Sequence, residues 1–164
     1  MLDLVPLSQI PAHAVEALLD AAFGTDRHAR TAYRVREGTK PTATLSFAAL
    51  EEGELVGSIQ CWPVALHGDD GSMTPLVMVG PVAVSPERQN VGIGRALMWK
   101  ALAAADAGSG GEALMLIGDP EYYELFGFDA GATGGWRLPG PFEPRRLLAR
   151  GAAPACSGML GPRR

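Results

Sequence analysis

One stretch of the chain, residues 73–117, constrains the fold more than any other. It begins with a valine-rich apolar run at 73–84, passes through a polar loop at 85–91, and continues as an alanine-rich segment at 92–107 whose apolar residues recur at helical spacing. A short, wholly apolar run follows at 113–117, which is typical of a strand in the middle of a sheet. A strand, a helix and a second strand in this order predict a parallel crossover, and therefore an α/β fold.

The segments on either side of this stretch add a sheet that is antiparallel at its beginning. Glu51–Glu54 is a tight turn between two apolar runs and predicts a hairpin. Glycine and proline (21 and 13 residues) are spread along the chain rather than gathered in a linker, so we expect one domain over 1–164. The other predicted elements are a strand at 2–7, helices at 8–23 and 26–36, strands at 44–50 and 55–66, a helix at 120–126, and strands near 128–137 and within 145–164.

The composition is that of an acidic globular protein. The net charge is −4 and the sequence pI is about 5.3, which disfavours nucleic acid as a partner because surfaces that bind it are usually basic. No apolar run approaches the roughly 18 residues of a membrane-spanning helix. The N-terminus has no basic region followed by a long apolar stretch, so we read no signal peptide. We therefore expect a cytoplasmic protein that binds neither nucleic acid nor membrane.

Cysteine and histidine are too few and too scattered to predict a metal site. The two cysteines, Cys61 and Cys156, lie far apart and match no metal-ligand spacing, and no pair of the three histidines has the spacing of a zinc motif. We expect reduced cysteines that serve packing, and no metal.

The polar loop opens into a helix with two glycines, Gly92 and Gly94, in its first turn. The first N–H groups of a helix have no partner within the helix and the helix dipole adds positive charge there, so such a start binds anions. A Walker loop is excluded because the segment has no Gly-Lys-Ser/Thr, and a dinucleotide-binding fold would place its glycines after the first strand. Close packing of the helix on the sheet stays open as a purely structural reason for the glycines.

The run Gln89-x-x-Gly92-x-Gly94, between a Val-x-Val strand and a helix, resembles the pyrophosphate-binding motif of GNAT-superfamily N-acetyltransferases. The resemblance covers about residues 1–150 and leaves 151–164 as a C-terminal strand or tail. It implies an α/β fold with a mixed central sheet of about six to seven strands flanked by about four helices, and acetyl-CoA as co-substrate. It also implies that amides of the loop hold the pyrophosphate and that the strand backbone pairs with the pantetheine arm of coenzyme A. The residues so assigned are Val82, Ala83, Val84, Gln89, Asn90, Val91, Gly92, Ile93, Gly94 and Arg95.

A second motif, residues 118–128, predicts a short helix with two adjacent tyrosines. Asp119 suits its N-cap and Gly127 its end. Adjacent side chains on a helix point about 100° apart, so only one tyrosine can easily face the core. Tyr123 stands four residues before Gly127, where GNAT proteins carry a tyrosine whose hydroxyl lies beside the coenzyme A sulfur, and the resemblance implies Tyr123 as the catalytic acid. Tyr122 is expected to pack, and a purely structural Tyr123 stays open.

The resemblance implies transfer of an acetyl group to a primary amine of a small molecule or protein, by direct attack in a ternary complex. The predicted strand at 73–84 carries no acidic residue, so Glu54, His67, a water chain or an amine that binds already neutral stay open as the base. The alternatives are a non-catalytic acyl-CoA-binding module, a hydroxyl acceptor or a longer acyl group, and a homodimer is a further open expectation. Candidates for lining an acceptor pocket are Arg34, Arg36, Trp62 and Trp136.

Overall fold

The computed structural model describes residues 1–89, 91–108 and 111–163. The strands are β1 (Leu2–Pro6), β2 (Phe47–Glu51), β3 (Glu54–Gly68), β4 (Met73–Val84), β5 (Ala113–Ile117), β6 (Trp136–Arg137), β7 (Leu147–Arg150) and β8 (Gly158–Pro162). The α-helices are α1 (Ala12–Phe23), α2 (Thr31–Val35), α3 (Ile93–Ala107) and α4 (Pro120–Tyr123). None of the helices described is long and apolar enough to cross a membrane.

The predicted mixed α/β fold is confirmed. The strands described form an eight-stranded sheet with the order β1-β2-β3-β4-β5-β7, and β8 pairs with both β3 and β6. The predicted parallel crossover is present, since Leu76–Met78 of β4 pair in parallel with Ala113–Met115 of β5. The sheet exceeds the expected six to seven strands because the last twenty residues contribute two strands, β7 and β8, while β6 accounts for the strand predicted near 128–137.

The chain forms two compact units, each built from three segments. The first contains Met1–His28, Pro41–Cys61 and Gly80–Ser109, and the second contains Ala29–Lys40, Trp62–Val79 and Gly110–Arg164. Strands β3 and β4 each contribute residues to both units. The expectation of one domain over 1–164 stays a prediction.

In the first unit, the predicted hairpin between β2 and β3 is confirmed. The two strands pair antiparallel from Phe47 opposite Ile59 to Glu51 opposite Glu54. The two turn residues both have positive φ, 52° at Glu52 and 80° at Gly53, which is the conformation of a tight two-residue turn. β1 extends this sheet by pairing antiparallel with β2.

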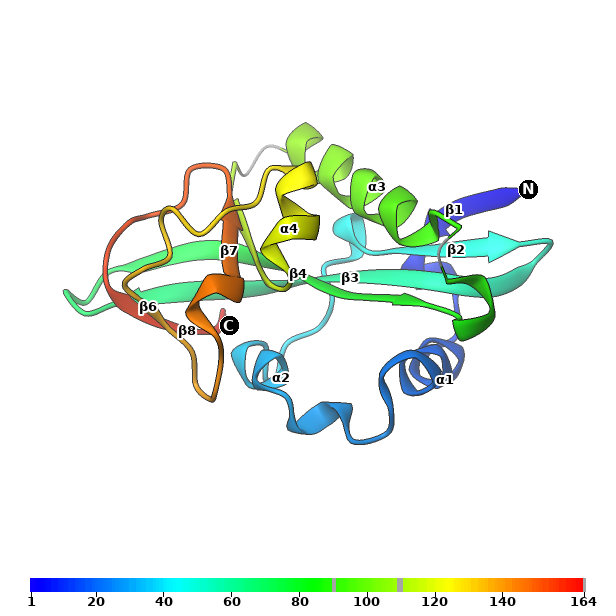
Figure 1. The fold of residues 1–164 in the computed structure, drawn as a ribbon, viewed down its shortest axis with the longest axis horizontal. Coiled ribbons are helices and arrows are strands. Elements are labelled where there is room, and N and C mark those ends of the chain that lie inside the picture. Colours follow the sequence, from blue (N-terminus) through cyan, green and yellow to red (C-terminus); the bar gives the residue numbers. More distant parts are fainter. Residues whose placement is uncertain (90, 109–110, 164) are drawn as a thin grey trace. The chain divides into compact units, whose positions relative to one another are not determined.

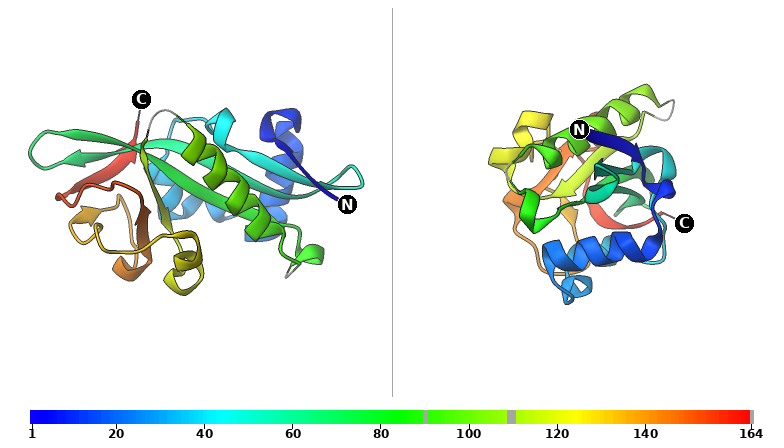
Figure 2. Two further views of the ribbon diagram at one scale, coloured as in Figure 1. Left: turned by 90° about the horizontal axis from the view of Figure 1, so that it is seen from above. Right: turned by 90° about the vertical axis from the view of Figure 1, so that its right-hand side faces the viewer.

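Helices α1 and α3 of the first unit lie on opposite sides of the β1–β3 strands (Figure 1), and the right-hand view of Figure 2 shows the same arrangement. On one side, Leu18 and Leu19 of α1 belong to a buried apolar cluster with Ala48 of β2. On the other side, α3 packs against Gly57 of β3. A Cβ atom on Gly57 would lie only 2.8 Å from Cγ2 of Ile93, so α3 can approach the strand this closely only over a glycine.

Three predicted elements are shorter than expected. The helix predicted at 8–23 begins at Ala12, because a proline at position 11 disfavours the helical conformation of the residue before it. The predicted helix at 26–36 divides into one 3-10 turn, Arg27–Ala29, and α2, consistent with its weak apolar periodicity. The strand predicted near 128–137 is reduced to β6 and one isolated bridge at Asp129, in a segment rich in glycine.

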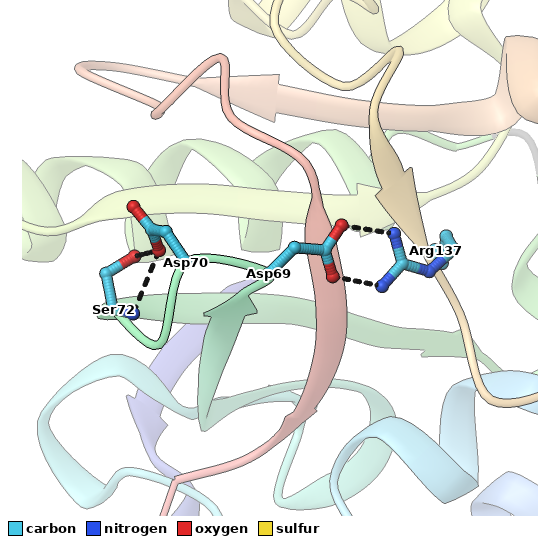
Figure 3. Close-up of polar contacts among 4 residues, drawn as sticks. All are labelled: Asp69, Asp70, Ser72 and Arg137. Carbon is cyan, nitrogen blue, oxygen red and sulfur yellow. Dashed lines mark hydrogen bonds and ion pairs between the residues drawn. The ribbon is translucent and has the colours of Figure 1, made fainter.

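The second unit surrounds β5, which pairs with β4 on one side and antiparallel with β7 on the other. β8 lies along the end of β3, with Val64–Gly68 opposite Gly158–Pro162 (Figure 2). The turn between β3 and β4 is joined to β6 by a bidentate ion pair from Arg137 to Asp69, with the shorter contact at 2.6 Å (Figure 3). This bond to the guanidinium lowers the pKa of Asp69. The pair is exposed, so its main effect is to fix the geometry of the turn.

Candidate active site

The loop from β4 to α3 forms the first candidate site. Pro86–Arg88 make one turn of 3-10 helix, and Gly92 is the N-cap of α3 in a left-handed conformation with a φ of 84°. The Gly92 carbonyl accepts the hydrogen bond of Ala96 N–H at 3.0 Å. Because the N-cap residue is a glycine, it has no side chain to bond the first amides of α3. These amides are therefore available to an anion, as the sequence predicts.

Two side-chain contacts hold this loop in place. Gln89 Nε2 donates to the Val84 carbonyl at 3.2 Å and so ties the loop to the end of β4. Arg88 Nε lies 2.8 Å from Glu51 Oε1, which anchors the loop to the end of β2. This hydrogen bond to the carboxylate raises the pKa of Arg88. The side chain of Gln89 thus has a structural task in addition to its predicted place in the site.

The glycines of the loop are not explained by close packing on the described residues. A Cβ atom on Gly92 would have no heavy atom within 4 Å, and glycine is favoured there by its positive φ. A Cβ atom on Gly94 would make ordinary contacts, 3.7 Å from Val84 Cγ2 and 3.9 Å from Val82 Cγ1. The packing glycine of this helix is Gly57 on the strand beneath it, so close packing on the described residues does not require a glycine at 92 or 94, and the space at Gly92 leaves its backbone accessible.

Nine of the ten predicted coenzyme A-binding residues lie together at the end of β4 and the start of α3, and the tenth, Asn90, lies outside the described residues. Val82 and Val84 are half-buried with their side chains toward α3, whereas Ala83 is buried in the apolar cluster of α1. Ile93 is also buried, so its side chain serves packing. The exposed members of the set are Gln89, Val91, Gly92 and Arg95.

The sequence analysis missed two polar side chains of β3 in the same unit. Ser58 Oγ and Gln60 Oε1 are buried without a hydrogen-bond partner in the part of the chain that the structure describes. Ser58 pairs with Ala48 of the α1 cluster, and residues two apart on a strand share a face, so both side chains lie on the α1 side. Polar residues at alternate positions of an otherwise apolar strand are the signal that could have identified them.

Helix α4 is the second candidate site. Asp119 occupies its N-cap and Gly127, with a φ of 87°, ends the 3-10 turn that follows it, as predicted. The Asp119 side chain, however, makes no capping bond, and it is the backbone carbonyl that accepts the N–H of Tyr123 at 3.0 Å. The carboxyl group is hydrogen-bonded to Glu121 instead, and this contact raises the pKa of Asp119.

Tyr123 is packed along its ring and accessible at its hydroxyl. The ring centroid lies 6.3 Å from that of Phe126 and 6.4 Å from that of Phe128. Burial is the main effect that raises the pKa of Tyr123, so the phenol is protonated at neutral pH. Its hydroxyl bonds no described residue and is not among the buried polar atoms, which leaves it able to donate a hydrogen bond to a ligand.

The burial of Tyr122 and Tyr123 falls in the same class. Both tyrosines are half-buried, and the expectation that only one of them faces the core stays a prediction. The two rings meet edge to face, with centroids 4.9 Å apart and planes at 89°, and each covers part of the other. Tyr122 also lies 5.5 Å from Phe126, which supports its expected role in packing.

The structure selects neither of the two side chains proposed as the base. Glu54 is exposed at the beginning of β3, next to the hairpin turn, and His67 is exposed near the end of the same strand. The strand β4 has no acidic side chain, as its sequence already shows, so the base stays open.

The four residues suggested for an acceptor pocket take part in packing within the second unit. Arg34 donates to the Pro139 carbonyl at 3.0 Å, and the Arg36 guanidinium lies 3.7 Å from the centroid of the Trp62 ring. Trp136 is buried and donates to a backbone carbonyl at 2.9 Å. These contacts hold α2 and the core of the unit, and the acceptor pocket stays a prediction.

Both cysteines are free thiols, as expected. Cys61 is buried in β3, and this burial raises the pKa of its thiol from 9.0 to about 12. Cys156 is half-buried. Over the described ranges, no three His, Cys, Asp or Glu side chains are grouped so as to hold a metal ion.

Alkaline pH is expected to destabilise the protein through Cys61. A thiol whose pKa is raised on folding stabilises the folded state fully below its unfolded pKa, here about 9, and the contribution is lost as the pH rises toward 12. At pH 10, which is about one unit above the unfolded pKa, the unfolding free energy should be lower by about 1.4 kcal/mol. Urea unfolding at pH 7 and pH 10 should therefore show a larger fall in unfolding free energy for the wild type than for Cys61→Ala. An equal fall in both proteins would contradict this assignment.

The profile of the acetyltransferase (GNAT) family matches residues 12–128, a range that contains both candidate sites. The chain belongs to the GNAT family. A relative from Escherichia coli K12, named as the uncharacterized N-acetyltransferase YhbS, is 30% identical over 157 residues, which cover 93% of this chain and 89% of the relative. The resemblance read from the glycine loop and the tyrosine helix is therefore confirmed at the level of the family.

Solved GNAT structures share the fold over nearly the whole chain. E. coli YhbS in complex with CoA has a TM-score of 0.72 at 24% identity, covering 99% of this chain and 89% of that one. A GNAT acetyltransferase from Brucella melitensis in complex with acetyl-CoA has a TM-score of 0.66 at 25% identity, covering 99% and 96%. The shared GNAT fold thus extends beyond residue 150, to the end that the sequence analysis set apart as a tail.

Proposed function

We propose that this GNAT protein transfers the acetyl group of acetyl-CoA to a primary amine of a small molecule or protein, by direct attack in a ternary complex. The observation that carries the proposal is the glycine start of α3, where backbone amides without a side-chain cap follow a loop anchored at both ends. The CoA and acetyl-CoA bound to similar proteins support acetyl-CoA as the donor. A cytoplasmic location and a homodimer stay predictions.

The start of α3 has the properties that a pyrophosphate group requires. We assign the pyrophosphate to the amides of residues 90–95, where the open space at Gly92 gives access to the backbone. The exposed guanidinium of Arg95 can add a charge-assisted contact. The pantetheine arm is assigned to the backbone of Val82–Val84. The pairing of β4 with β5 stops at Met78, so it does not occupy this part of β4.

Two groups of the chain are assigned to the transfer itself. A backbone N–H near Val82 can stabilise the oxyanion that forms when the amine attacks the thioester carbonyl. Tyr123 is assigned to the departing thiolate. A thiol has a pKa near 8.5 and a tyrosine near 10, so complete proton transfer is uphill by about 2 kcal/mol, and the raised pKa of Tyr123 increases this cost. We therefore propose that Tyr123 mainly donates a hydrogen bond to the sulfur.

One observation favours a second candidate, a non-catalytic acyl-CoA-binding module. The attacking amine must lose a proton, yet β4 has no acidic side chain, and Glu54 and His67 are exposed at the two ends of β3. An enzyme remains consistent with this if the amine binds in its neutral form.

An acceptor screen separates the two candidates. The protein is incubated with acetyl-CoA and a panel of primary amines, alcohols and lysine-containing peptides, and the products are read by mass spectrometry. A protein-dependent acetylated amine is the expected result. Products formed only from alcohols, or only with a longer acyl donor, would indicate the other two alternatives. Tight acetyl-CoA binding without any product would favour the binding module.

Turnover is expected to be independent of metal ions. The thioester is already an activated acyl donor, and the described residues include no cluster of metal-ligating side chains. Adding a chelator to the transfer assay should leave the rate unchanged. A loss of rate that zinc or magnesium reverses would reveal a metal site.

A further inference from the structure

We infer that Gly118 is a positioning residue for Tyr123, because the absence of a side chain at 118 is what lets the tyrosine ring take its place. The inference rests on the proposed role of Tyr123. Gly118 lies between β5 and the N-cap of α4 and carries no chemical group of its own.

The decisive observation is the distance between the two residues. A Cβ atom built on Gly118 would lie 2.8 Å from Cδ2 of Tyr123, and nearer still to Cε2. Carbon atoms in contact are about 3.5–4.0 Å apart, so the smallest side chain at position 118 is incompatible with the present position of the ring. The Tyr123 ring therefore rests directly on the backbone of residue 118.

The backbone at 118 is not free to move away from the ring. Gly118 N–H donates to the Arg146 carbonyl at 2.9 Å, which ties it to the segment entering β7. On the same side, Cδ1 of Leu116 would be 3.2 Å from the added Cβ atom. An alanine at 118 is thus accommodated by moving the tyrosine rather than the backbone.

The remaining neighbours of Tyr123 explain why such a move would matter. Phe126, Phe128 and the edge of Tyr122 surround the ring, and the hydroxyl bonds no described residue. The position of the hydroxyl is therefore determined by ring packing alone. A displacement of about 1 Å at a reacting group can lower the rate about 10²-fold.

Conformation does not account for the glycine at this position. Gly118 is not among the glycines with positive φ, so its backbone is open to any residue. A residue outside the positive-φ region would ordinarily accept a side chain. The contact with Tyr123 is the reason that the structure gives for a glycine here.

The first test follows the Tyr123 phenol and needs no acceptor. The ultraviolet absorbance of tyrosinate is titrated in wild type, Gly118→Ala and Tyr123→Phe, and the Tyr123 component is obtained by difference among the three tyrosines. Wild-type Tyr123 should titrate above its usual pKa, and Gly118→Ala should shift it down toward that value as the ring moves into solvent. Gly134→Ala is the matched control, since a Cβ atom there has no neighbour within 4 Å. An unshifted titration in folded Gly118→Ala would overturn the inference.

The second test uses turnover with acetyl-CoA and a diamine, an amino sugar or a lysine peptide as the acceptor. Gly118→Ala should lower kcat about 10²-fold, close to Tyr123→Phe, with the affinity for acetyl-CoA unchanged. In the Tyr123→Phe background, Gly118→Ala should add little, because the hydroxyl is already absent. If the two substitutions instead lower kcat by independent factors that multiply in the double variant, Gly118 acts by another route and the inference is contradicted.

The outcomes separate this inference from the proposed function. Full activity of Tyr123→Phe would contradict the proposed role of Tyr123 in acetyl transfer. The absorbance titration would still decide whether Gly118 positions the tyrosine ring. If Gly118→Ala does not fold, Gly118→Ala/Tyr123→Ala should restore folding, since the obstructing ring is gone. Failure of that double variant to fold would show that Gly118 is needed for a different reason.

Discussion

Tyr123→Phe is expected to lower acetyl transfer about 10²-fold while leaving acetyl-CoA affinity and stability nearly unchanged. Proton donation by a placed side chain is typically worth 10²–10⁴-fold, and the raised pKa of this phenol keeps the expected effect at the lower end of that range. The variant removes one hydroxyl and keeps the ring packed against its aromatic neighbours. Steady-state release of free coenzyme A thiol with an identified amine measures the effect.

The neighbouring tyrosine supplies the control. Tyr122→Phe also removes one hydroxyl from α4, but Tyr122 is assigned to packing, so its loss of turnover should be much smaller. Equal, wild-type rates for both variants would make Tyr123 structural. A greater loss for Tyr122→Phe would move the catalytic assignment by one residue and leave the family unaffected.

Gly94→Val is expected to weaken coenzyme A binding about 10²-fold in a protein that still folds. A branched side chain at the start of α3 obstructs the amides assigned to the pyrophosphate, and losing one such charge-assisted hydrogen bond costs about 1.5–3 kcal/mol. The fold should persist, because a Cβ atom at 94 makes only ordinary contacts, at 3.7 and 3.9 Å. Calorimetric titration with coenzyme A, alongside thermal unfolding, measures both effects.

The other end of the same helix provides the matched substitution. Gly108, the C-cap of α3, has an extended backbone (φ −73°, ψ 154°) that suits valine, so Gly108→Val should retain affinity. Gly92→Val is less informative, since a φ of 84° strains any side chain there. If folded Gly94→Val binds coenzyme A like the wild type, the anion site is wrongly assigned. Lost stability with retained affinity would instead identify a packing glycine.

Regular elements with a strong local signal were predictable from the sequence. β4, β5 and the crossover between them lie where the apolar runs place them, and α3 begins one residue from its predicted start. The segments whose secondary structure was predicted incorrectly are those whose conformation depends on pairing with distant parts of the chain. β6 retains two residues of a predicted strand because, among the described residues, it pairs only with β8, and no local sequence pattern predicts that pairing.

The candidate site was predictable where backbone chemistry determines it and not where tertiary contacts do. The left-handed Gly92 and the helix end at Gly127 follow from glycine itself. The anchoring of the loop by Arg88 and Glu51 joins residues 37 positions apart and has no local signature. The contact of Gly118 with Tyr123 joins residues five positions apart and depends on how the chain enters α4, which residue types alone do not specify.

The buried state of Cys61 has a practical consequence for measuring this protein. Colorimetric detection of released coenzyme A relies on a disulfide reagent that is attacked by any accessible thiolate, including those of the protein itself. Cys61 stays a thiol at the pH of such assays because burial raises its pKa to about 12. The background from native protein should therefore not exceed one equivalent, contributed by Cys156, and a cysteine-free variant would be unnecessary.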